Sequence, residues 1–109
     1  MKELPRCPVE ITLMLIGNKW KVLILRDLMS GARRFGELKK SINTISHKVL
    51  TQQLRSMEED GIIERVVYAD RPPKVEYSLT EEGTRLRPIL TAMSTWGKEY
   101  KEHIIKDVK

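Results

Sequence analysis

The hydrophobic positions of the chain recur at helical spacing in several segments and alternate with polar positions in two shorter ones. The clearest helical segment spans residues 46–60, where Leu50, Leu54 and Met57 form one apolar stripe. Ser46 is a good N-cap, because its hydroxyl can accept a hydrogen bond from a backbone N–H of the first turn. The pattern therefore predicts an amphipathic helix that begins after Ser46 and buries the stripe.

The opposite face of this predicted helix is polar and holds no acidic residue between positions 46 and 55. Such a face can enter a DNA major groove without repelling phosphates, and Gln and Arg side chains can each make two hydrogen bonds to a base edge. A short helical pattern over residues 35–40 and a break over residues 41–45 come before it. Together these features predict a helix-turn-helix over about residues 35–60. A polar face that is merely solvated is the alternative.

Two segments after the predicted helix-turn-helix have the composition of β-strands. Residues 63–68 are rich in β-branched side chains, and residues 75–79 alternate between apolar and polar. The connection holds two prolines, which keep its tip out of the ladder, and it presents Arg71 and Lys74. A hairpin over about residues 63–79 would form a basic wing able to reach a phosphate or the minor groove. An ordinary surface hairpin is the alternative.

The first part of the chain predicts two more helices. Residues 8–16 are mostly apolar and end at Gly17, a natural C-terminal cap. A helix that is apolar around its circumference must be buried or shared with another subunit. Asn18 can cap the next helix, over residues 19–29, which carries enough large apolar side chains to be the core helix. Residues 32–34 could form a very short strand.

A long final helix is predicted over about residues 81–105, with Thr80 as its N-cap, and Pro88 should kink or divide it. Its apolar seam exceeds what so small a core can cover, so we expect it to pack against a second copy of the chain. Packing within the chain is the alternative. The side chains expected at the interface come from the first and last helices: Val9, Leu13, Ile16, Leu86, Leu90, Met93, Trp96 and Tyr100.

Composition narrows the class of protein. At 109 residues we expect a single domain over positions 1–109, and the net charge of +5 favours an anionic partner. The single cysteine, Cys7, excludes a disulfide framework and suits a reducing compartment. No apolar run approaches the roughly 18 residues that cross a bilayer, and residues 1–6 lack the apolar core of a signal peptide. We therefore expect a cytoplasmic protein that does not bind membranes.

The sequence offers no set of residues that could carry out catalysis. One cysteine and two widely separated histidines do not give a metal-ligand spacing. The sequence also holds no glycine-rich phosphate loop and no nucleophile elbow. We therefore predict a protein that is not an enzyme and that uses neither a metal nor a cofactor.

Six stretches of the chain resemble the HxlR-type winged helix-turn-helix regulators. They are residues 7–11 (CPVEI), 16–25 (IGNKWKVLIL), 34–38 (RFGEL), 45–55 (ISHKVLTQQLR), 59–63 (EDGII) and 72–83 (PPKVEYSLTEEG). The resemblance covers about residues 5–100 in order. It implies an α+β, mainly helical fold, a winged helix-turn-helix with N- and C-terminal dimerisation helices. It also implies a homodimeric transcription regulator of a bacterium or archaeon, with the second helix of the motif in the major groove and the wing on the flanking backbone.

Under this prediction the protein binds double-stranded DNA in a sequence-specific manner. The side chains expected at the DNA belong to the helix-turn-helix and the wing: Arg34, Ser46, His47, Lys48, Thr51, Gln52, Arg55, Arg71 and Lys74. A winged-helix module that binds proteins without specific DNA binding is the alternative. Such modules usually place acids or large apolar groups on the outer face of the second helix, and this face has neither. The sequence indicates no particular small-molecule effector.

Cys7 is a candidate redox site. In several members of the family that the chain resembles, the cysteine at this place senses oxidants or electrophiles. Cys7 lies just before a predicted helix N-terminus and near Lys2 and Arg6, and such surroundings favour the reactive thiolate. An inert, buried small hydrophobe is the alternative. Because the chain has no second cysteine, a disulfide would have to join two protomers or capture a small thiol.

Overall fold

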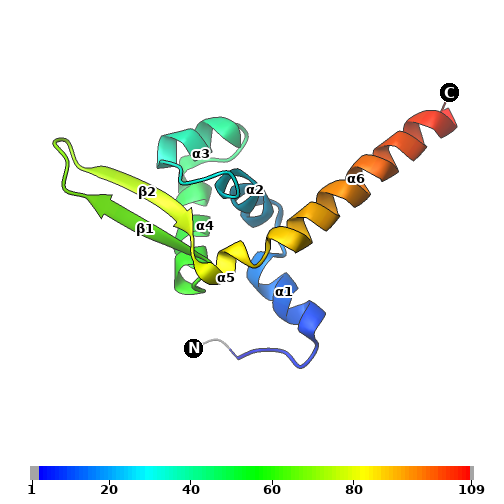
Figure 1. Cartoon of the computed structure of the whole chain (residues 1–109), viewed down its shortest axis with the longest axis horizontal. Coiled ribbons are helices and arrows are strands. Elements are labelled where there is room, and N and C mark those ends of the chain that lie inside the picture. Colours follow the sequence, from blue (N-terminus) through cyan, green and yellow to red (C-terminus); the bar gives the residue numbers. More distant parts are fainter. Residues whose placement is uncertain (1–2, 109) are drawn as a thin grey trace.

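The computed structural model describes residues 3–108, which fold into six helices and one two-stranded sheet (Figure 1). In chain order the elements are α1 (Pro8–Ile16), α2 (Lys19–Leu28), α3 (Phe35–Ser41), α4 (His47–Glu59), β1 (Ile63–Tyr68), β2 (Lys74–Leu79), α5 (Glu81–Thr84) and α6 (Arg87–Val108). The hairpin extends from one side of the helices α2–α4, and α6 extends from the other (Figure 1). The predicted α+β, mainly helical winged helix-turn-helix is confirmed, with α3 and α4 as the two helices of the motif.

Polar side chains cap the N-termini of α2 and α4, as the sequence predicted. The backbone N–H of Lys21 donates to Oδ1 of Asn18 at 2.9 Å, and that of Val49 donates to Oγ of Ser46 at 3.0 Å. These bonds satisfy first-turn donors that have no partner within the helix. Gly61 has a φ of +72°, a backbone conformation that favours glycine, and it follows the end of α4.

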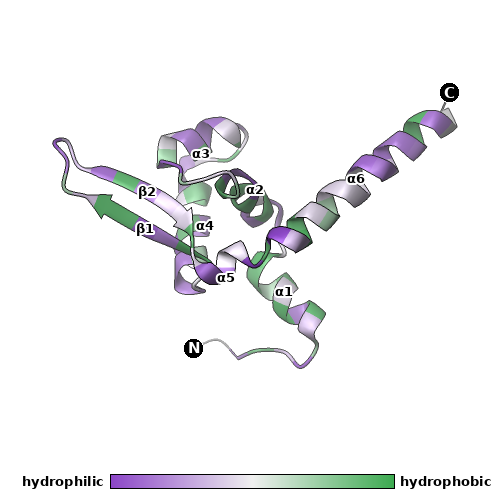
Figure 2. Ribbon diagram, in the orientation of Figure 1, coloured by the Kyte–Doolittle hydropathy of each residue, from purple (hydrophilic) through white to green (hydrophobic). Residues whose placement is uncertain are grey.

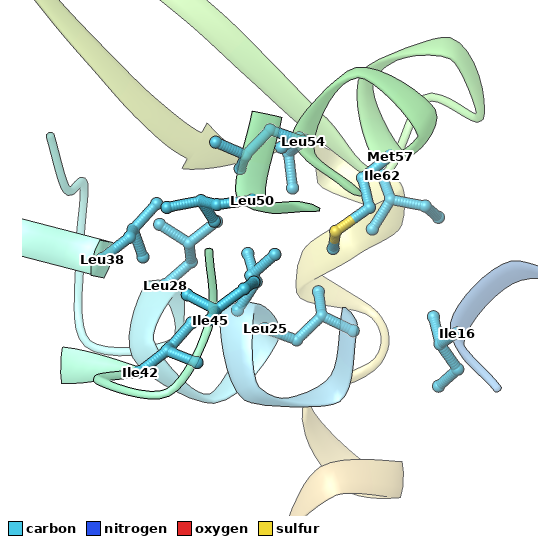
Figure 3. Packing of buried hydrophobic residues seen from close by; sticks show 12 residues of the cluster. Ile16, Leu25, Leu28, Leu38, Ile42, Ile45, Leu50, Leu54, Met57 and Ile62 are labelled. Carbon is cyan, nitrogen blue, oxygen red and sulfur yellow. The ribbon is translucent and has the colours of Figure 1, made fainter. Parts of the chain in front are cut away.

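The core lies where α2, α3 and α4 meet, and Figure 3 shows their aliphatic side chains turned toward one another. The side chains that are almost completely buried are Ile24, Leu25, Leu38, Ile45, Leu50, Leu54, Met57 and Ile63. Burying one such side chain stabilises the fold by about 1.5–3 kcal/mol. The predicted stripe on α4 is therefore the face that holds this helix against α2, and the helix cannot rotate without exposing it.

The sheet ties the wing to the start of the helix-turn-helix. β1 and β2 pair antiparallel, in register from Ile63 opposite Leu79 to Tyr68 opposite Lys74. The predicted strand over residues 32–34 is a single bridge, in which the backbones of Arg33 and Tyr77 exchange hydrogen bonds of 2.9 and 2.8 Å. The base of the wing is thus anchored beside α3.

The helix expected over residues 81–105, which Pro88 was predicted to kink or divide, is divided into two helices. α5 ends at Thr84, and α6 begins at Arg87 with Pro88 as its second residue. Proline has no N–H to donate and a fixed φ that suits a first helical turn, so the chain restarts a helix there and does not kink one. The break lets α6 leave in a new direction (Figure 1).

Ile16, expected at a surface between two copies, is only 4% exposed in the protomer and belongs to the core of its own chain, at the edge of the groove between α1 and α6. Only the last turn of α1 reaches the core. Val9 and Leu13, earlier in the same helix, are 66% and 60% exposed. Leu86 and Leu90 are half-buried against the core, so they also contribute to packing within the chain.

Candidate nucleic-acid interface

The outer face of α4 is defined by what its inner face buries. Because Leu50, Leu54 and Met57 are sealed in the core, the intervening positions of the helical repeat are directed away from it. The α4 side chains expected at the DNA lie here, with Ser46, His47, Lys48, Gln52 and Arg55 exposed and Thr51 half-buried. The core therefore determines which side chains α4 offers to a partner.

Three side chains of this face are available to a ligand. Within the part of the chain that the structure describes, Lys48, Gln52 and Arg55 make no hydrogen bond and no ion pair with other residues. The acidic side chains of α4 are Glu58 and Glu59, at its C-terminal end. The N-terminal end of a helix carries a partial positive charge. The N-terminal half of α4 thus presents donors and positive charge, and the C-terminal end presents acids.

The smaller residues of this face are partly engaged within the chain. Ser46 caps the helix, and Oγ1 of Thr51 donates to the carbonyl oxygen of His47 at 2.9 Å. The His47 ring lies against the ring of Phe35 from α3, with centroids 4.6 Å apart and planes tilted by 47°. His47 is therefore positioned by the first helix of the motif, and the long side chains are the less constrained part of the face.

A contact that the sequence did not predict links α2 to α4. Nδ2 of Asn18 donates to Oε1 of Gln53 at 3.1 Å, across 35 positions of the chain. Asn18 thus caps α2 with its oxygen and holds α4 with its nitrogen. Gln53 follows the exposed Gln52 but is itself half-buried, at the border between the two faces of α4. The sequence offered one indication that Gln53 could contact another helix: helical spacing places Gln53 beside the apolar stripe of α4.

The two basic residues expected at the wing differ in their exposure to solvent. Arg71 is exposed at the tip, whereas Lys74 is half-buried. Nζ of Lys74 lies 3.6 Å from Oε2 of Glu76 and 5.5 Å from the centroid of the Tyr68 ring. Alternate residues of a strand share one face, which explains the pairing of Lys74 with Glu76. Arg71 is therefore the better placed of the two to reach an external phosphate.

The arginines before α3 also differ in their surroundings. The Arg33 guanidinium donates to Oγ of Ser30 at 2.7 Å and to the carbonyl oxygen of Ala32 at 3.0 Å. Arg34 is exposed at the N-cap of α3, where its backbone N–H donates to Oε1 of Glu37 at 2.9 Å. Arg33 is thus held by its own loop, and Arg34 stands at the surface at the start of the helix-turn-helix.

A second, apolar surface lies away from α4, on α1 and α6. Figure 2 shows apolar residues along α1 and recurring along α6. Trp96 and Tyr100 are 66% and 53% exposed, and their rings stack with centroids 5.1 Å apart. An apolar groove of about 650 Å³ lies between α1, α2 and the start of α6. Large exposed apolar surface is typical of sites where proteins contact other proteins.

The sequence and the fold agree with one family of known proteins. The profile of the HxlR-like helix-turn-helix family matches residues 15–105. The chain belongs to this family. This HxlR-like chain is 51% identical over 100 residues to YdeP of Bacillus subtilis, a protein described as an HTH-type transcriptional regulator, covering 92% of the chain and 78% of YdeP.

Further relatives extend the range of organisms and give a solved structure. An HTH-type transcriptional regulator of Methanothermobacter thermautotrophicus is 46% identical over 97 residues, covering 89% of the chain and 74% of the relative. The redox regulator HypR in its oxidized form is 48% identical with a TM-score of 0.82, covering 85% of the chain and 96% of HypR. HxlR-like proteins are thus transcription regulators, not enzymes, and they occur in bacteria and archaea.

Cys7 of this HxlR-like chain is exposed and occupies the N-cap position of α1, where its side chain makes no capping hydrogen bond. The alternative of a thiol buried in its own protomer is therefore wrong. Lys2, expected near this thiol, lies outside the described residues. Over residues 3–108 the fold gathers no group of three potential metal-ligating side chains, and it has no helix long and apolar enough to cross a membrane.

Proposed function

We propose that this protein is a homodimeric transcription regulator that binds double-stranded DNA in a sequence-specific manner. The N-terminal half of α4 would enter the major groove, and the wing would touch the flanking backbone. The observation that carries this proposal is the part of the outer face of α4 that holds no acid, residues 47–55, on which Lys48, Gln52 and Arg55 have no partner within the described residues. Gln and Arg can each bind a base edge through two hydrogen bonds, and Lys can neutralise a phosphate.

Dimerisation is supported by the second surface. Val9 and Leu13 of α1 and Met93 of α6 line one apolar groove, and Trp96 and Tyr100 further along α6 are also exposed, so no described part of the chain covers these side chains. A two-fold pairing through α1 and α6 would bury this area and present two copies of α4 to the two halves of a palindromic operator. The symmetry of the protein would then match the symmetry of its DNA site.

A gel-shift titration against genomic DNA fragments at two salt concentrations tests the proposed function. A sequence-specific regulator retains a small subset of fragments at the higher salt, because base contacts persist where phosphate contacts are screened. If all fragments are released together, or none is bound, the proposal fails. A protein-interaction module would give that result, although the outer face of α4 over residues 47–55 carries neither the acids nor the large apolar groups typical of such modules.

Replacing Arg71 with alanine should weaken binding to all DNA sequences to a similar degree. Arg71 is exposed at the wing tip and would neutralise one phosphate, so the slope of log affinity against log salt should become shallower by about one unit per protomer. Lys74→Ala provides the matched comparison and should change the slope less, because Glu76 already partners the Lys74 ammonium. An unchanged slope in Arg71→Ala would remove Arg71 from the phosphate contacts.

We further propose that Cys7 makes DNA binding responsive to oxidants. The exposure of the thiol and the identity of 48% with a redox regulator support this proposal. A hydroperoxide would take two electrons and two protons from a pair of thiols, either two Cys7 thiols of paired protomers or Cys7 and a small thiol, leaving a disulfide and releasing water and an alcohol. Hydroperoxide should therefore alter operator affinity in the wild type but not in Cys7→Ser. An equal response of both proteins would contradict the role of Cys7.

A further inference from the structure

Over the described side chains, up to residue 106, helix α6 packs against the rest of the chain at its beginning alone. Leu86, just before the helix, and Leu90, in its first turns, are half-buried against the core. Every residue from 91 to 106 is exposed, and Figure 1 shows the helix extending away from the other elements. The direction of α6 is therefore set by a few contacts at its beginning.

One of these contacts is a long-range hydrogen bond made by Arg87. Nη2 of Arg87 donates to the backbone carbonyl oxygen of Met29 at 2.9 Å, across 58 positions of the chain. Met29 is the C-cap of α2, where carbonyl groups lack helical partners and carry the negative end of the helix dipole. Among the described residues, this is the one side-chain hydrogen bond or ion pair that joins α6 to another helix.

Two adjoining grooves lie at the base of α6. The apolar groove of about 650 Å³ is shared with α1 and α2. A groove of about 530 Å³, whose lining includes Arg26, Met29, Arg87 and Lys98, lies between α6 and α2 and shares Met93 with the first. Close packing against α2 therefore does not fix the angle of α6 beyond Leu90. The hydrogen bond from Arg87 to Met29 lies at the base of α6, where a small rotation gives the largest displacement of the far end of the helix.

The length of α6 converts a small tilt into a large displacement. At a rise of about 1.5 Å per residue its 22 residues extend about 33 Å. A tilt of about 5° at the base moves the far end by about 3 Å, close to the rise of roughly 3.4 Å per base pair along DNA. If two protomers pair through α6, the angle of this helix sets the separation of their two α4 helices.

We infer that Arg87 is a positioning residue that determines which half-site spacing the dimer accepts. The inference rests on the proposed function. Arg87 acts through Met29 and α6 and needs no contact with DNA, so its loss should leave dimerisation intact and broaden the range of operator spacings that are bound. A role in phosphate binding would lower affinity for all spacings equally and would leave their ratio unchanged.

The test is an affinity series on operators whose half-sites are moved together or apart by one and two base pairs. Wild-type protein should prefer one spacing. In Arg87→Ala the preference for that spacing over its neighbours should fall by about tenfold, as expected for loss of a charge-assisted hydrogen bond. Arg87→Lys, whose ammonium can donate to the same carbonyl, should recover most of the preference.

Arg85→Ala is the matched control, because the Arg85 guanidinium pairs at 2.7 Å with Glu82 of its own short helix and with no other element. This variant should keep the wild-type spacing profile. An Arg87→Ala dimer with the wild-type profile would overturn the inference while leaving the proposed function intact. A wild-type protein that binds no operator as a dimer would overturn the proposed function and, with it, the role of Arg87.

Discussion

Replacing Trp96 with alanine is expected to turn a dimer into a monomer and to abolish tight operator binding. Trp96 is 66% exposed in the protomer and stacks on Tyr100, so it contributes little to the core of its own chain. A buried tryptophan at the centre of an interface is worth about 2–4 kcal/mol, and two-fold symmetry removes it twice. The dimer dissociation constant should therefore rise at least about a hundredfold, and Tyr100→Ala should act in the same direction.

Sedimentation velocity over a range of concentrations measures this change. Glu102→Ala is the control, because Glu102 is exposed about 120° around α6 from Trp96 and about 160° from Tyr100, at 3.6 residues per turn. The thermal unfolding of Trp96→Ala at low concentration should show that the protomer still folds. A Trp96→Ala protein that sediments as the wild-type dimer would exclude this face of α6 from the interface.

Replacing Gln52 or Arg55 with alanine should lower affinity for the specific operator by a large factor. Each side chain has no partner within the described residues and projects from the acid-free half of α4. Loss of a bidentate contact with a base costs about 1–3 kcal/mol, and a dimer loses it in both half-sites, so the total is about 2–6 kcal/mol for each variant. Binding to non-operator DNA should change much less for Gln52→Ala, because glutamine carries no charge.

Competition titrations with operator and mutated operator measure this loss of specificity. Glu59→Gln is the control, because Glu59 is exposed at the opposite end of the same helix and removing its charge should not weaken binding. Operator affinities equal to the wild-type value in both Gln52→Ala and Arg55→Ala would exclude the outer face of α4 as the reading surface.

Local patterns predicted the elements that position the candidate interface. The caps at Asn18 and Ser46 depend on interactions within a few residues, and the stripe through Leu50 and Leu54 depends on the helical period alone. The β-branched composition of residues 63–68 likewise corresponds to β1. These features were predictable because the forces that create them act between near neighbours in the sequence.

Contacts between distant parts of the chain were not predictable in the same way. The bond from Asn18 to Gln53 joins positions that no periodicity relates, and the bond from Arg87 to Met29 depends on where α6 restarts after α5. Ile16 was assigned to an interface because α1 is apolar on all sides, and that composition does not show which turn meets the core. The pairing of Lys74 with Glu76 was not predicted, because the predicted strand began at residue 75 and left Lys74 in the wing tip, whereas β2 begins at Lys74.

The central claim is that paired protomers hold two α4 helices in successive major grooves on one side of the DNA. A hydroxyl-radical footprint of the operator complex measures this arrangement directly. The claim predicts two protected blocks per strand whose centres lie about one helical turn apart, roughly 34 Å or 10–10.5 base pairs. A single protected block, or protection spread evenly along the duplex, would contradict it.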